Sequence, residues 1–121
     1  MVQIRLLDLQ NDQVIFSGNA NSIDRPKGVH WEFGQYVWKV YEDILIIDSQ
    51  GEVHVHLICQ QGKPTQAKIQ TEYGEIRLHC ETSLYTINER SIEVQYTLKM
   101  EEQIEHFHFR LEIKGANYAF H

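Results

Sequence analysis

Two His-x-His pairs are the residues of this sequence whose type and spacing come nearest to a known chemistry. His54 is followed by His56, and His106 is followed by His108. On a β-strand, residues i and i+2 share a face and lie roughly 6–7 Å apart, so two imidazoles can reach one metal ion. Each pair is therefore a candidate for two of the ligands of a metal site.

A catalytic zinc site needs three protein ligands and one open coordination position. Three nitrogens become available here if segments 52–60 and 104–114 lie together, or if His79 joins a pair. A β-meander keeps these two segments apart, and the metal-binding cupin pattern fails because Gln60 and Gln61 stand where it requires a glutamate. We predict no metal centre and no cofactor, with a metal site on the histidine pairs as an alternative.

The segment HWEFGQYVWKVY concentrates aromatic side chains and contains both tryptophans of the chain. Trp31 and Phe33 share one parity, and a bulge at Gly34 would bring Tyr36 and Trp38 to the same side. Such a run is typical of the wall of a ligand pocket, which is mostly apolar and aromatic. It is equally typical of side chains that fill a narrow barrel. The sequence leaves both interpretations open.

Arginines are candidates for orienting a polar ligand. Arg77 and Arg110 sit on the polar parity of their strands, as does Arg5. An arginine that turned inward beside a tyrosine would bind a ligand carboxylate through two N–H groups. The alternative is a solvated arginine flanked by Glu75 or Glu112, since charges are rarely buried unpaired.

The sequence contains no convincing motif for nucleophilic catalysis. No serine lies in a nucleophile-elbow motif, and no glycine-rich phosphate loop or convincing carboxylate pair is present. Cys59 and Cys80 fall on the apolar parity of their strands, which predicts buried free thiols with raised pKa values. We therefore expect a protein without enzymatic activity.

Length and composition indicate one globular domain that spans residues 1–121. The chain is 42% hydrophobic and 23% charged, with a net charge of -6. This balance excludes a disordered chain and argues against nucleic-acid binding, which needs a basic patch. Apolar runs are too short to cross a bilayer. Because Arg5, Asp8 and Asp12 interrupt the N-terminal apolar stretch, no secretory signal is predicted and we expect a cytoplasmic protein.

Hydrophobic side chains alternate with polar ones along most of the chain, which is the signature of half-buried β-strands. Turn residues separate the runs, and the segment from Ser17 to Gly28 is expected to be one long irregular connection. Gly34 and Gly74 stand inside strand patterns and indicate a bulge or a bend. The predicted strands cover residues 2–9, 14–18, 29–41, 44–48, 52–60, 65–73, 75–81, 83–87, 91–100 and 104–114.

Strands joined by short connections pair in antiparallel fashion with their sequence neighbours. About eight to ten such strands must hide both their apolar faces and their edges, and a closed barrel does both. We predict an all-β fold, namely a single antiparallel meander barrel. A two-sheet sandwich is the alternative.

Several segments resemble a known family. TEYGEIRLHCETSLYTI, followed by SIEVQYTLKM and IEHFHFRLEI, is similar to the YwiB-like family of uncharacterised bacterial proteins, as are YVWKVYED and GEVHVHLICQQGK. The features shared with the family are the pair Tyr73-Gly74, Thr82 and an apolar-x-Tyr-x-apolar strand centred on Tyr96. The resemblance implies a calycin-type, lipocalin-like barrel and implies no activity or catalytic residue.

The leading functional hypothesis is a non-enzymatic protein that binds a small apolar or amphipathic molecule inside the barrel. One alternative is a protein–protein interaction module or homodimer that uses exposed aromatic or edge-strand surface. The other is the metal site on the histidine pairs. The predicted ligand-binding residues are Trp31, Phe33, Tyr36, Trp38 and Tyr96, with Arg77 or Arg110 orienting a polar head.

Overall fold

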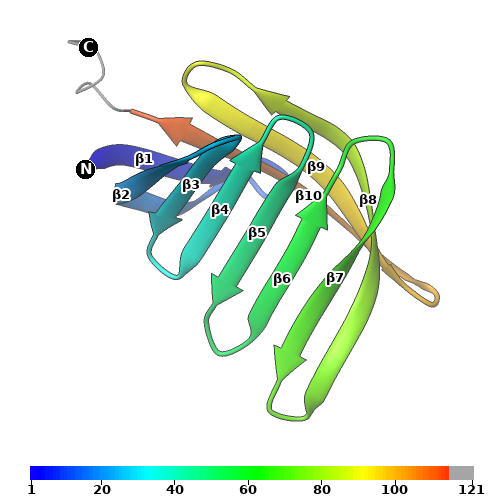
Figure 1. Ribbon diagram of the computed structural model, residues 1–121. Helices are drawn as coiled ribbons and strands as arrows, with labels where there is room; N and C mark the ends of the chain where they lie inside the picture. The colour runs from blue at the N-terminus through cyan, green and yellow to red at the C-terminus, as the bar shows by residue number, and fades with distance from the viewer. Residues whose placement is uncertain (115–121) are drawn as a thin grey trace.

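The computed structural model describes residues 1–114, which form ten β-strands and no helix (Figure 1). No helix in this range is long and apolar enough to cross a membrane. The strands are β1 Val2–Asp8, β2 Gln13–Arg25, β3 Gly28–Phe33, β4 Tyr36–Tyr41, β5 Leu45–Gln50, β6 His54–Cys59, β7 Pro64–Thr71, β8 Gly74–Ile87, β9 Ser91–Met100 and β10 Gln103–Ile113.

The strands form a closed antiparallel meander barrel, as predicted. Each strand pairs with its sequence neighbours, and β1 closes the ring by pairing with β10 in a register that sets Leu6 opposite Leu111. Every described strand has a neighbour on both sides. Residues 13–20 of β2 pair only with β1, and residues 103–107 of β10 pair only with β9, so the edge-strand contact considered above stays a prediction. The all-β, calycin-like fold is thereby confirmed, and the sandwich alternative is wrong.

The long irregular connection expected between Ser17 and Gly28 is instead part of a strand. β2 continues to Arg25, pairing with β1 through its first part and with β3 from Asn21 onward. Small polar residues hide the alternation because few β2 side chains enter the core, and only Ala20 is fully buried. Pairing with two neighbours, rather than hydrophobic pattern, defines this strand.

Three strand boundaries also differ from the prediction. The segment 29–41 is two strands joined by a turn at Gly34, whose φ of 56° is in the left-handed region that favours glycine. Gly74, with a φ of 128°, begins β8 after a tight turn rather than bending a strand. The segments 75–81 and 83–87 form the single strand β8, which is interrupted by a bulge between Thr82 and Leu84.

The barrel has two unlike ends. Turns β3–β4, β5–β6, β7–β8 and β9–β10 surround one end, where the β7–β8 hairpin projects beyond its neighbours (Figure 1); we call this the open end. At the other end, the Tyr85 hydroxyl donates a hydrogen bond of 2.5 Å to the Tyr41 carbonyl across the barrel. We call this the closed end.

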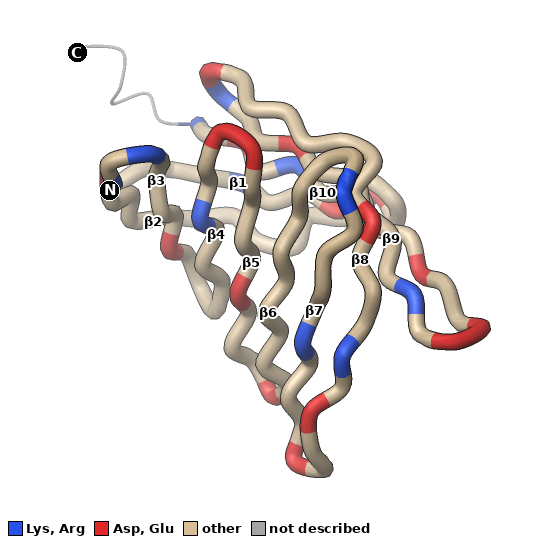
Figure 2. Tube along the Cα trace, turned by 45° about the vertical axis from the view of Figure 1, so that its right-hand side comes forward, with Lys and Arg blue, Asp and Glu red and all other residues tan. Residues whose placement is uncertain are grey.

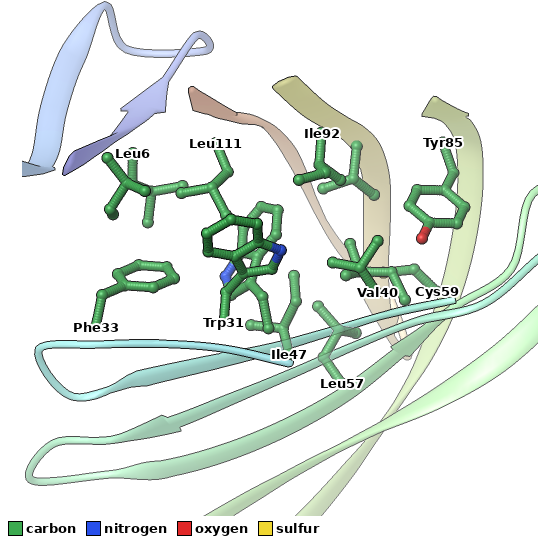
Figure 3. Packing of buried hydrophobic residues seen from close by; sticks show 14 of the residues in the cluster. Leu6, Trp31, Phe33, Val40, Ile47, Leu57, Cys59, Tyr85, Ile92 and Leu111 are labelled. Atoms are coloured by element: carbon green, nitrogen blue, oxygen red, sulfur yellow. The ribbon is translucent and has the colours of Figure 1, made fainter. Parts of the chain in front are cut away.

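Apolar side chains from all ten strands fill the middle of the barrel (Figure 3). Trp38, Leu45 and Leu57 are among the largest fully buried side chains. Trp31 pairs with Trp38 across β3 and β4, so the two tryptophans share the interior face. Cys59 and Cys80 are buried free thiols, as predicted. A core of this extent supplies the main stabilisation of the fold.

Candidate functional site

An apolar groove enters the barrel from the open end. It consists of an outer cavity of about 350 Å³ and an inner cavity of about 220 Å³. The two cavities are adjacent, since Val55, Leu57, Tyr96 and Phe107 line both. We call the two cavities together the groove, and its walls are interior faces of the strands.

The outer cavity is lined by aliphatic side chains. Ile69 of β7, Leu78 of β8 and Leu98 of β9 point into it because they occupy the inward parity of their strands. Met100 and Ile76 lie at its rim and are partly exposed. Such surfaces bind alkyl groups without directional contacts, because the hydrophobic effect depends on buried area.

Aromatic rings dominate the inner cavity. Tyr36, Trp38, Tyr96, Phe107 and Phe109 line it. The rings of Tyr96 and Phe107 stack with centroids 5.1 Å apart, and the rings of Phe107 and Phe109 stack at 6.1 Å. These contacts hold the rings against one wall, so the shape of the cavity is largely preformed.

One carboxylate lies in this aromatic cavity. Asp8 is the last residue of β1 and has only 8% of its surface exposed. Its Oδ1 accepts hydrogen bonds from the backbone N–H groups of Gln10 and Asn11, and its Oδ2 accepts one from the Asn11 amide. No described cationic side chain forms an ion pair with it, although Lys and Arg side chains form seven ion pairs with other carboxylates in residues 1–114.

Two residues that line the inner cavity, Tyr96 and Trp38, also carry a polar side-chain atom. Burial raises the pKa of Tyr96 well above its ordinary value, and the negative charge of Asp8 acts more weakly in the same direction. The phenol is therefore neutral at physiological pH. Trp38 Nε1 is the buried polar side-chain atom in the described range that has no hydrogen-bond partner.

The structure divides the predicted aromatic residues into two groups. Tyr36, Trp38 and Tyr96 line the groove. Trp31 and Phe33 are buried in the core and line neither cavity. The four residues of the β3–β4 segment do share one face, but they do so through cross-strand pairing around the Gly34 turn rather than through a bulge. Both interpretations of the aromatic run, pocket wall and core filling, therefore apply to different residues.

The two predicted arginines lie outside the groove. Arg77 is exposed on the outer face of β8 and bonds Glu75 at 2.9 Å. Arg110 is on the outer face of β10, where it contacts Glu93 at 3.3 Å and Glu112 at 3.5 Å. The interpretation that one of them orients a ligand head inside the barrel is corrected: strand alternation directs both outward, to partners in solvent.

The histidine pairs are also on the outer face, and the structure does not bring them together. β6 and β10 are separated by three strands in the ring. His56 Nδ1 bonds Asp48 at 2.6 Å, and His108 Nε2 bonds Glu93 at 2.7 Å, which lowers the pKa of Glu93. In residues 1–114 no three His, Cys, Asp or Glu side chains converge on a common point.

The two thiols form a coupled pair in the core. The hydrogen bond from Cys59 lowers the pKa of Cys80 to about 7, against the effect of burial, while the pKa of Cys59 is raised by the same bond and by burial. Burial acts in the expected direction on both thiols, and at Cys80 the hydrogen bond from Cys59 outweighs it. Both cysteines have no exposed surface, so a reagent reaches them only after the barrel opens.

Sequence reasoning missed several groove residues. In the sequence Asp8 interrupts the N-terminal apolar stretch, yet it continues the inward parity of Ile4 and Leu6. A charged residue at an inward position is the signal that identifies it. Phe107 and Phe109 were placed correctly on the apolar face, but alternation does not distinguish a groove wall from a packed core.

Comparisons with known proteins support the fold and name no activity. Residues 34–113, from the β3–β4 turn to the end of β10, match the family described as domain of unknown function DUF1934. A similar solved structure is the crystal structure of the ywiB protein from Bacillus subtilis, with a TM-score of 0.62 and 19% identity over 95% of this chain and 88% of that one. At this identity the likeness shows the fold alone. No curated protein matches the sequence.

Proposed function

Because the chain belongs to the DUF1934 family of domains of unknown function, its role has to be argued from its own groove, and we propose that it binds a small apolar or amphipathic molecule there. The observation that carries the proposal is the groove itself. It reaches from solvent at the open end to the aromatic rings in the barrel interior. Barrels with a packed closed end and an accessible open end suit this role.

The balance of lining residues supports binding rather than catalysis. Neither cavity is lined by a histidine, cysteine, lysine or arginine among the described residues. Asp8 is held by the turn that follows β1 and has no basic partner that would make it part of an acid–base pair. The proposed activity is therefore non-enzymatic. Two reduced cysteines support a cytoplasmic setting, where thiols are kept unpaired.

The experiment is a titration with N-phenyl-1-naphthylamine, an uncharged probe whose fluorescence rises in apolar surroundings. The variant Ile69→Trp places an indole in the outer cavity, because Ile69 lines it. The matched control is Lys68→Trp, one residue earlier on β7 and on the outer face. We expect probe binding by the wild type and by Lys68→Trp, and loss of binding in Ile69→Trp.

Circular dichroism and thermal unfolding establish that both variants fold. Binding that is equally strong in the two variants would show that the probe sits elsewhere. Absence of probe binding by the folded wild type would mean that the groove does not accept an apolar molecule, and either result would refute the proposed function.

A further inference from the structure

We propose that the occupant of this groove is an amphipathic organic cation, such as an alkylammonium, with its charged head in the inner cavity and its apolar tail in the outer one. This inference rests on the proposed function and adds the charge of the ligand. It reverses the arrangement considered from the sequence, in which an arginine would have received a carboxylate.

The charges that line the groove have one sign. The ionisable acids among the lining residues are Asp8 in the inner cavity and Glu105 at the outer rim. No described Lys, Arg or His lines either cavity, since Arg77 and Arg110 are bound to glutamates on the outer face. A carboxylate or phosphate head would enter without a counter-charge and next to Asp8, which electrostatics disfavours.

Asp8 is placed to receive a cation. Removing a carboxylate from water is costly unless it is hydrogen-bonded and paired with an opposite charge. Three hydrogen bonds fix the carboxylate, but only one of them reaches Oδ2 and none comes from a charged donor. A cationic head in the inner cavity would supply the missing charge without any rearrangement of the turn.

The aromatic rings are the second, independent feature. Five rings, of Tyr36, Trp38, Tyr96, Phe107 and Phe109, line the same cavity as the Asp8 carboxylate. Aromatic faces carry negative potential and attract ammonium groups, most strongly where both are shielded from water.

The entrance carries the same sign of charge. Acidic residues occupy the tips of the β7–β8 and β9–β10 hairpins (Figure 2), with Glu72 in one turn and Glu101 and Glu102 in the other. Of the neighbouring cations, Lys99 is bound to Glu81 on the outer face. Charge of this sign raises the local concentration of cations and repels anions, and it agrees with the net charge of -6 for the whole chain.

The test compares three ligands with one tail and different heads: octyltrimethylammonium, octanoate and 1-octanol, each below its aggregation concentration. Calorimetric titration at pH 7 measures their affinities. We expect the cation to bind at least about ten-fold more tightly than octanoate, as cation–π and charge contacts in a shielded site imply, with octanol between them.

The variant Asp8→Asn keeps an Oδ1 that accepts the two backbone hydrogen bonds and removes the charge. It should abolish most of the preference for the cation and leave the affinity for octanol unchanged. Asp24→Asn, an exposed position on β2, alters the net charge equally and should preserve the preference. If Asp8→Asn does not fold, Phe107→Leu replaces it, and we expect the same loss of preference.

The outcomes separate this inference from the proposed function. Equal binding of all three ligands, or tighter binding of octanoate, would overturn the inference about charge while the groove remains a binding site. A preference that survives in folded Asp8→Asn, or in Phe107→Leu where Asp8→Asn does not fold, would also overturn it. Failure of all three to bind would overturn the proposed function as well.

Discussion

The closed end of the barrel depends on one tyrosine, and the variant Tyr85→Phe tests this dependence. The Tyr85 hydroxyl lies 2.5 Å from the carbonyl oxygen of Tyr41 and 3.4 Å from that of Ile44. Tyr85 belongs to β8, Tyr41 ends β4 and Ile44 lies in the turn that follows, so the bond joins opposite sides of the barrel. The aromatic ring of residue 85 remains in the core after the substitution, and only the hydrogen bond is removed.

The expected cost follows from the burial of this bond. A net contribution of about 1 kcal/mol is typical of a hydrogen bond in a protein, and a carbonyl left unpaired away from water adds about 1 kcal/mol or more. We therefore expect the free energy of unfolding to fall by about 2 kcal/mol. At about 2.1 cal/mol/K per residue, the unfolding entropy of this chain is about 0.25 kcal/mol/K, so Tm should fall by about 8 °C.

Urea unfolding followed by circular dichroism measures the change, with Tyr73→Phe as the control. Tyr73 is 91% exposed in the β7–β8 turn, so its hydroxyl contributes little to stability. Affinity for the naphthylamine probe should not change in either variant, because Tyr85 lies at the end remote from the groove. A Tyr85→Phe variant that unfolds within about 0.3 kcal/mol of the wild type would refute the argument that this bond closes the barrel.

Three other predictions concern the core and the outer face. Gly28→Ala should lower the unfolding free energy by about 3 kcal/mol in urea titrations, because a Cβ there would lie 2.2 Å from the Val40 carbonyl oxygen; wild-type stability would contradict this. Glu93→Gln should lower the free energy of unfolding at neutral pH. The pKa of Glu93 is lowered in the folded protein, so its carboxylate adds stability that is fully present above pH 4.5 and is lost when it is protonated. The difference in unfolding free energy between the variant and the wild type should therefore shrink as the pH falls below 4.5. Thermal unfolding from pH 7 to pH 3 measures this, and a constant difference would disprove it. Cys59 and Cys80 have no exposed surface, so they should react with a thiol reagent only at the rate at which the barrel opens. Labelling that is as fast without denaturant as in urea would show that the thiols are accessible in the folded protein and would contradict this prediction.

The ring of strands was largely predictable because a period of two is a local property of the chain. β9 shows this well: Ile92, Val94 and Tyr96 are inward and buried, as the alternation requires. β2 was only partly predictable, because Asn19, Asn21 and Ser22 carry no hydrophobic signal and are held in a strand by pairing with both neighbours.

The candidate site was predicted less well, since its parts are far apart in sequence. Tyr36 and Trp38 were identified from a cluster within one segment. Asp8, Phe107 and Phe109 come from strands at opposite ends of the chain, and they meet because β1 closes the ring against β10. No spacing in the sequence encodes that closure.

By itself, the sequence determined which side chains share a face, because alternation on a strand follows from backbone geometry alone. It therefore established an all-β chain and placed Arg77 and Arg110 on the polar parity. The tertiary structure decided which face is interior, where the core ends and the groove begins, and that the inward-facing charge is the acid Asp8. These depend on ring closure and on how far large side chains such as Trp31 and Phe33 fill the interior, which are properties of long-range packing rather than of local pattern.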